Sequence, residues 1–167
     1  MKKTYLFLAA IILTINISFA QTGWIDYKVD NKVSARLPTA PKTLMEGTVM
    51  SLTPDSTVCV VTKVDFEATA HLDSAALAPL LATDEFSTGL RTGMEQQMQG
   101  FTLSEVKTGM LKGAHTYNIE GVNESQKIKS YTFMVVIGKY MYSFTAIVKN
   151  GRDTKHRDEL FASVQIK

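Results

Sequence analysis

Three histidines are the residues of this chain best suited to binding a metal or moving a proton, namely His71, His115 and His156. They are far apart, and none belongs to a His-x-His, His-Glu-x-x-His or cysteine-paired pattern that would bring two ligands together. We expect His115 to lie on the buried face of a strand beside Tyr117, and His156 to lie on a solvated helix. The spacing therefore predicts no metal centre and no cofactor, unless tertiary contacts alone assemble one.

Cys59 is the only cysteine, so the chain cannot form an internal disulfide. Its neighbours in Val58-Cys59-Val60-Val61 indicate a strand, where a thiol is more typical of a small core residue than of a nucleophile. The alternative is an intermolecular disulfide, which requires an exposed sulfur. The chain also has no Gly-x-Ser-x-Gly elbow and no glycine-rich phosphate loop. We therefore expect no catalytic residue and no enzyme activity.

Lysines are interleaved with tyrosines over residues 127–149, a combination that can bind nucleic acid. The overall charge argues against that role. The chain has 18 basic and 16 acidic residues, for a formal net charge of +2, and Lys2 and Lys3 account for this excess. The neutral remainder provides no clustered basic face, so we expect no nucleic-acid partner. Lysines on edge strands, where they discourage aggregation, explain the pattern.

The first twenty residues have the three parts of a secretory signal peptide. Two lysines form a positive start, residues 5–15 are largely apolar, and Ser18 and Ala20 occupy the −3 and −1 positions of a cleavage site. A transmembrane anchor is the alternative, but the apolar stretch is shorter than the ~20 residues that a span needs. We therefore expect cleavage to remove residues 1–20. Residues 21–167 would then be periplasmic or secreted, without stable membrane insertion.

Alternation of apolar and polar residues predicts strands through most of the remaining chain. Val33, Ala35 and Leu37 alternate with polar residues, which is typical of a strand with one buried face. Both faces are apolar around residues 58–61, so we expect a central strand covered on both sides. This central strand is predicted over residues 56–66, and the other predicted strands cover residues 24–29, 43–52, 101–111, 115–120, 128–137 and 140–148.

Two segments have helical periodicity. Within residues 72–98, Thr83 can cap a helix. That helix would carry one apolar stripe with a four-residue repeat, formed by Phe86, Leu90, Met94 and Met98. We expect the stripe to pack on the sheet, and Gly89 and Gly93 to let the helix approach it closely. Residues 153–164 have a similar repeat and predict a final helix.

The predicted elements follow the order strands, helix, strands, helix. Short turns such as Lys112-Gly113 and Gly138-Lys139 imply antiparallel pairing between neighbouring strands. Helices packed on an antiparallel sheet give an α+β domain, and the doubly apolar strands indicate that helices cover much of both faces. We therefore predict one α+β domain over residues 21–167, with an antiparallel β-sheet sandwiched by helices.

Three short motifs resemble the PsbP-like family, whose fold is shared with a Ran-binding nucleotide-release factor. They are Trp24-x-x-Tyr27, the segment Val33-Ser34-Ala35-Arg36-Leu37-Pro38-x-x-Pro41, and the closing Leu160-Phe161-Ala162-Ser163-Val164. The resemblance implies an antiparallel sheet sandwiched by helices, in an extracytoplasmic and generally non-catalytic accessory or binding protein. The resemblance assigns no functional residue to this sequence. The photosynthetic members assist a manganese cluster, but no matching ligand motif stands in this sequence.

The sequence favours an exported, non-catalytic accessory protein that binds a protein partner or small ligand of unknown identity. Trp24 is the candidate partner-binding residue, because it lies near the mature N-terminus, where burial is often incomplete. Its alternative role is a lid over the core, since large aromatic side chains are highly buried on average. The alternative function is a small exported hydrolase or a ligand carrier, with a site assembled by tertiary contacts.

Overall fold

The computed structural model describes residues 23–167, so the predicted signal peptide of residues 1–20 lies outside the described residues. The strands are β1 (Ile25–Lys28), β2 (Val33–Leu37), β3 (Lys42–Met45), β4 (Thr48–Leu52), β5 (Val58–Asp65), β6 (Thr102–Leu103), β7 (Lys107–Leu111), β8 (Ala114–Asn123), β9 (Ile128–Ile137), β10 (Tyr140–Lys149) and β11 (Gln165–Ile166). The helices are α2 (Phe66–Ala70), α3 (Ser74–Leu77), α4 (Asp84–Gln97) and α5 (Lys155–Ala162). Among these described helices, none combines the length and the apolar character needed to cross a membrane.

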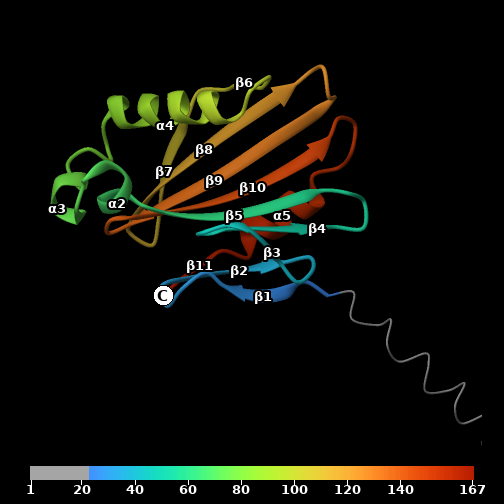
Figure 1. Ribbon diagram of the computed structural model, residues 1–167, viewed down its shortest axis with the longest axis horizontal. Coiled ribbons are helices and arrows are strands. Elements are labelled where there is room, and N and C mark those ends of the chain that lie inside the picture. The colour runs from blue at the N-terminus through green and yellow to red at the C-terminus, as the bar shows by residue number, and fades with distance from the viewer. Residues whose placement is uncertain (1–22) are drawn as a thin grey trace, which may run out of the picture.

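The strands form two sheets (Figure 1). The larger sheet has eight strands in the order β3-β4-β5-β10-β9-β8-β6, with β7 also paired to β8. The smaller sheet has the order β1-β2-β11. All of these pairings are antiparallel, as the short turns predicted. The structure is therefore a mixed α+β fold dominated by antiparallel sheets.

The longest strands lie next to one another at the centre of the larger sheet. β9 and β10 pair along their whole lengths, from Ile137 opposite Tyr140 to Ile128 opposite Lys149. The turn between them places Gly138 at a φ of 61°, a left-handed conformation that glycine adopts without strain. The strand bounds predicted from the sequence agree closely with the structure here.

Two predicted strands are interrupted in the structure, and a third ends earlier than predicted. Residues 43–52 form a hairpin, β3 and β4, because the chain turns at Gly47, where φ is 73°. Residues 101–111 contain two strands, β6 and β7, which both pair with β8. The last residue of the predicted strand 56–66 begins α2 instead, since the Asp65 carboxylate caps that helix by accepting two backbone hydrogen bonds.

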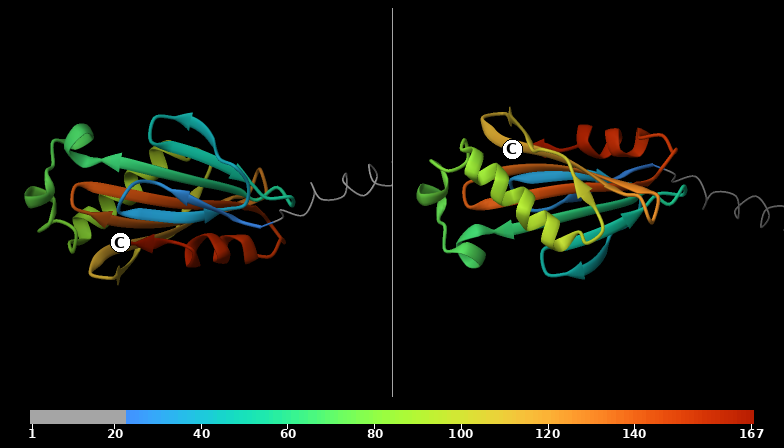
Figure 2. Two further views of the ribbon diagram at one scale, coloured as in Figure 1. Left: turned by 90° about the horizontal axis from the view of Figure 1, so that it is seen from below. Right: turned by 90° about the horizontal axis from the view of Figure 1, so that it is seen from above.

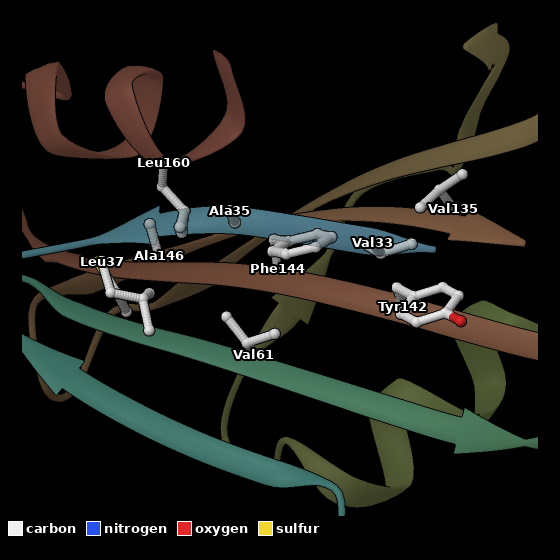
Figure 3. Close-up of a cluster of buried hydrophobic side chains, with 10 residues drawn as sticks. Val33, Ala35, Leu37, Val61, Val135, Tyr142, Phe144, Ala146 and Leu160 are labelled. Atoms are coloured by element: carbon white, nitrogen blue, oxygen red, sulfur yellow. The ribbon is translucent and has the colours of Figure 1, made fainter. Parts of the chain in front are cut away.

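One face of the larger sheet packs against the smaller sheet and α5. Their shared core, which we call the first core cluster, consists of Val33, Ala35, Leu37, Cys59, Val61, Val135, Tyr142, Phe144, Ala146 and Leu160 (Figure 3). Leu160 reaches into this cluster from α5 and is fully buried. This face is thus covered by a small sheet as well as by a helix, an arrangement that the sequence did not predict.

The opposite face of the larger sheet carries α4, which runs obliquely across the strands (Figure 2). The second core cluster lies beneath it and consists of Leu77, Leu81, Leu103, Tyr117, Ile119, Met134 and Val136. The Tyr117 hydroxyl donates a 2.6 Å hydrogen bond to the carbonyl oxygen of Leu81, shortly before α4 begins. Burial raises the pKa of Tyr117 to about 12, so this hydroxyl stays protonated at neutral pH and ties the start of α4 to the sheet.

Candidate functional site

An open groove of about 690 Å³ lies between α4 and the part of the larger sheet formed by β5 and β10. Its size is within the range of small-molecule sites. We call it the α4 groove. It is lined by Val60, Thr62, Val64, Phe66, Leu80, Thr83, Glu85, Phe86, Gly89, Leu90, Gly93, Met94, Gln97, Met98, Met134, Met141, Ser143, Thr145 and Ile147.

The strand register explains which side chains form the floor of the α4 groove. It pairs three groove residues of β5 with three of β10: Val60 with Thr145, Thr62 with Ser143, and Val64 with Met141. Opposed residues of an antiparallel pair point to the same face, and the residues between them point to the other. Cys59 and Val61 accordingly face the first core cluster. The expectation that β5 is covered on both sides is therefore wrong for its second face, because α4 packs over β8 and β9 instead.

Hydroxyl groups form a polar strip on this otherwise apolar floor. Thr62 accepts a 3.3 Å hydrogen bond from the Thr48 hydroxyl, and the hydroxyls of Thr132 and Thr145 share a hydrogen bond of 3.0 Å. The half-buried Ser143 hydroxyl makes no hydrogen bond to another described residue. A bound molecule could therefore use Ser143 as either a donor or an acceptor.

The α4 groove carries almost no charge. Glu85 is the only ionisable residue among the described residues that line it. This exposed carboxylate lies in the first turn of α4, where it interacts favourably with the helix dipole. A structural role thus explains Glu85, and the groove offers no fixed positive charge to an anionic ligand.

The apolar stripe predicted for α4 does pack against the sheet. All four of its residues contact the second core cluster, and the Phe86 ring lies 5.4 Å from the Tyr117 ring and 5.9 Å from the Phe66 ring. No residue of α4 is fully buried, however, because the α4 groove leaves one side of the stripe open. The loss of stability expected for Leu90→Ala is therefore smaller than the ~2–5 kcal/mol typical of a fully buried leucine.

The two glycines of α4 do not bring the helix close to the sheet, so that prediction is wrong. Gly89 and Gly93 both line the α4 groove, and a Cβ atom on either would meet no atom within 4 Å. Their missing side chains widen the groove instead of tightening the packing.

Replacing Gly89 by alanine is expected to stabilise the protein by about 0.5–1 kcal/mol, because alanine favours the helix and its methyl group enters open space. Urea unfolding followed by circular dichroism measures the change. Gly121→Ala is the control and is expected to destabilise the protein, since its Cβ would lie 2.5 Å from the Ser130 hydroxyl and 2.8 Å from a Leu103 methyl carbon. Destabilisation by Gly89→Ala would mean that this side of α4 is packed after all.

The structure places Trp24 on the side of the larger sheet opposite the α4 groove. The side chain is half-buried against the first core cluster, and its ring stacks on His156 with centroids 6.0 Å apart. Its carbonyl oxygen also accepts a hydrogen bond from Arg36. These contacts are those of a partial lid, and a role of Trp24 in partner binding stays a prediction.

The fold does not bring the three histidines together. His156 was predicted to be solvated, but this is wrong. Trp24 stacks on its ring and Asp55 lies 3.7 Å from its Nε2, so the side chain is only 26% exposed. His115 is half-buried in β8, and His71 is exposed at the end of α2. Within residues 23–167, no three histidine, cysteine or acidic side chains are grouped so that they could hold a metal ion.

Cys59 is fully buried in the first core cluster, as its apolar neighbours predicted. Burial raises the pKa of the Cys59 thiol to about 12, and the negative charge of Asp55 adds to the shift. At neutral pH the sulfur is therefore protonated as well as inaccessible, and it is a poor nucleophile.

A maleimide reagent is expected to leave Cys59 unmodified in the folded protein. It should modify Cys59 fully in about 8 M urea, which unfolds most small domains. Mass spectrometry of the intact chain reads out both states. Rapid modification without urea would contradict the buried position and restore the intermolecular disulfide as an alternative.

None of the residues that line the α4 groove was predicted from the sequence to belong to a site. The sequence did contain one sign of an apolar surface on the second face of the sheet: both faces of β5 and β10 carry apolar residues. Only one long helix, α4, is available to cover the second face of the eight-stranded sheet, and the described part of the chain has no other of that length.

Comparisons with known proteins bear on the fold alone. No protein-family model matches the chain, and no curated protein matches it in sequence. The solution structure of cyanobacterial PsbP from Synechocystis superposes with a TM-score of 0.56 at 12% identity, covering 90% of this chain and 96% of that one. Crystal structures from Bacteroides thetaiotaomicron and Pseudomonas aeruginosa give TM-scores of 0.43 and 0.48, at 10% and 12% identity.

The shares of each chain that these structures match also differ. The Pseudomonas aeruginosa comparison covers 81% of this chain and 88% of that one. The Bacteroides thetaiotaomicron comparison covers 88% of this chain, which spans only 49% of that longer structure. The likeness to cyanobacterial PsbP, whose length is almost fully matched, confirms the resemblance predicted from the sequence: the chain has a PsbP-like fold.

Proposed function

We propose that this chain is an exported, non-catalytic accessory protein that binds its partner molecule in the α4 groove, on a PsbP-like sheet flanked by α4 and α5. The single observation that carries the proposal is the groove itself. An open, apolar cavity of about 690 Å³ is costly to leave exposed to water, and such cavities in proteins commonly hold ligands.

Binding without catalysis fits the side chains of the groove. Ser143, Thr62 and Thr145 are the hydroxyl groups on its floor, and a nucleophilic hydroxyl needs a base within about 2.6–3.2 Å. Neither a histidine nor a lysine is among the described residues that line the groove, and their one carboxylate, Glu85, is exposed in the first turn of α4. Of the two alternatives left open by the sequence, this favours a ligand carrier over a hydrolase.

The α4 groove is a better candidate site than Trp24. Trp24 already contacts the first core cluster and His156, so only part of its side chain is available to a partner. Gly89 and Gly93, by contrast, leave open space beside an apolar surface. The signal peptide predicted for residues 1–20 supports a partner outside the cytoplasm.

The function is tested by recovering the tagged protein from the exported fraction of its own cells and identifying bound material by mass spectrometry. Gly93→Phe fills the α4 groove, whereas Thr92→Phe places the same side chain on the exposed face of α4 and is the matched control. We expect the wild-type protein and Thr92→Phe to retain the same material, and Gly93→Phe to lose it. A stoichiometric metal or redox cofactor, or identical material on all three proteins, would overturn the proposal.

A further inference from the structure

We propose that the occupant of the α4 groove is a single aliphatic chain with an uncharged, hydrogen-bonding head group, such as a monoacylglycerol. This inference rests on the proposed function and names the class of ligand. Hydrogen bonding argues against an extended peptide as occupant, and charge argues against an ionic head group inside the groove.

A partner helix is the competing occupant, because it could insert one apolar face into the open α4 groove. The experiments below distinguish it: retention of a partner protein by the wild-type chain, its loss from Gly93→Phe, and no saturable binding of a dodecyl probe would identify a helix.

Hydrogen bonding excludes an extended peptide. Each residue of a bound strand would bring one N–H and one C=O group that need partners once water is removed. The groove is bounded by the face of a sheet and the side of a helix, whose own backbone groups are already paired within those elements. Only a few hydroxyls, such as those of Ser143 and Thr145, remain to serve the ligand. A hydrocarbon chain has no such requirement.

Charge excludes an anionic or cationic head inside the groove. The described lining residues include no lysine, arginine or histidine that could pair with a carboxylate or a phosphate. The exposed Glu85 would repel an anion, and by itself it gives a cation only a weak, water-screened contact. The Ser143 hydroxyl can instead donate to an ester oxygen or accept from an alcohol.

The flexibility of the walls suits a linear chain. Four methionines, Met94, Met98, Met134 and Met141, line the α4 groove. Their unbranched, polarisable side chains adapt to irregular apolar partners. Gly89 and Gly93 leave the groove open along α4, so a long molecule can enter from the side.

The experiment compares three probes that share a twelve-carbon chain: 1-dodecanoylglycerol, dodecanoate and dodecyltrimethylammonium, each below its micelle concentration. Isothermal titration calorimetry at several temperatures measures binding to the mature protein. We expect 1-dodecanoylglycerol to bind saturably, one per chain, with a negative heat-capacity change and at least about tenfold more tightly than either charged probe. Absence of saturable binding, or equal or tighter binding of a charged probe, would overturn the inference.

Groove variants locate the bound chain. Gly93→Phe is expected to weaken 1-dodecanoylglycerol binding at least about tenfold, and Thr92→Phe to leave it unchanged. Circular dichroism confirms that each variant is folded, and Gly89→Phe serves as a second filling variant with the same expectation. Unchanged binding by a folded filling variant would overturn the inference.

The two proposals can fail separately. If no dodecyl probe binds, yet material from the exported fraction is retained by the wild-type protein and lost by Gly93→Phe, the ligand class is wrong and the function stands. If Gly93→Phe changes neither probe binding nor retained material, both are wrong.

Discussion

Replacing Leu160 by alanine is expected to lower the free energy of unfolding by about 2–5 kcal/mol, the range found for fully buried leucines. Leu160 has an exposed fraction of 0% and is the α5 side chain that completes the first core cluster. The change would leave a cavity between α5, β2 and the larger sheet, and the surrounding strands can close it only in part. Urea unfolding monitored by circular dichroism measures the loss.

Leu44→Ala is the matched control for this prediction, because it makes the same chemical change at a side chain that is 51% exposed on the edge strand β3. We expect its effect to be within about 0.5 kcal/mol, as for most surface substitutions. Equal losses in the two variants would mean that α5 is not anchored through Leu160.

The elements that the sequence predicted best are those whose signals are local. The bounds of β9 and β10 follow from long apolar runs and from the turn at Gly138-Lys139. The start of α4 follows from Thr83, whose hydroxyl accepts a 3.2 Å hydrogen bond from the backbone N–H of Phe86. Each signal lies within a few residues of the element that it specifies.

The elements that the sequence missed depend on contacts with distant residues. β11 contains only two residues and exists because Gln165 and Ile166 pair with Ser34 and Val33, near the other end of the chain. α2 replaces the end of a predicted strand because Asp65 can cap a helix as readily as it can end a strand. Periodicity within a short window carries no information about such pairings.

The α4 groove was missed for a related reason. The four-residue repeat correctly predicted which face of α4 turns toward the sheet. It says nothing about which strands the helix packs against: the stripe contacts buried residues of β8 and β9, and the α4 groove separates the helix from β5 and most of β10. The same repeat is compatible with a closed core or an open groove, and the position of the helix decides between them.

A polar network beside the first core cluster joins the two sheets. Asp30, in the turn between β1 and β2, accepts 2.6 Å hydrogen bonds from the Lys63 ammonium and the Tyr142 hydroxyl of the larger sheet. It also accepts hydrogen bonds from the backbone N–H groups of Lys32 and Val33, which hold the turn. Partial burial alone would raise the pKa of Asp30, but the hydrogen bonds, that of Lys63 foremost, outweigh it and hold this pKa well below its ordinary value of 3.8.

Asp30→Asn is expected to lower the free energy of unfolding by about 2–4 kcal/mol at pH 7, because it removes the charge that pairs with Lys63 and leaves the fully buried Tyr142 hydroxyl with a weaker acceptor. Asparagine retains a side-chain oxygen for the turn, so the loss reports on the link between the sheets. Asp26→Asn, at a side chain that is 96% exposed, is the control and should have little effect.

The pH dependence of this loss identifies the carboxylate as its cause. A carboxyl group whose pKa is depressed by folding stabilises the protein above its unfolded pKa, and that contribution disappears as the pH falls through the folded pKa. The difference in unfolding free energy between the wild-type protein and Asp30→Asn should therefore be constant above about pH 5 and shrink below about pH 4. Urea unfolding between pH 3 and pH 7 measures it. A difference that stays constant down to pH 3 would mean that the turn, rather than the charged link between the sheets, accounts for the lost stability.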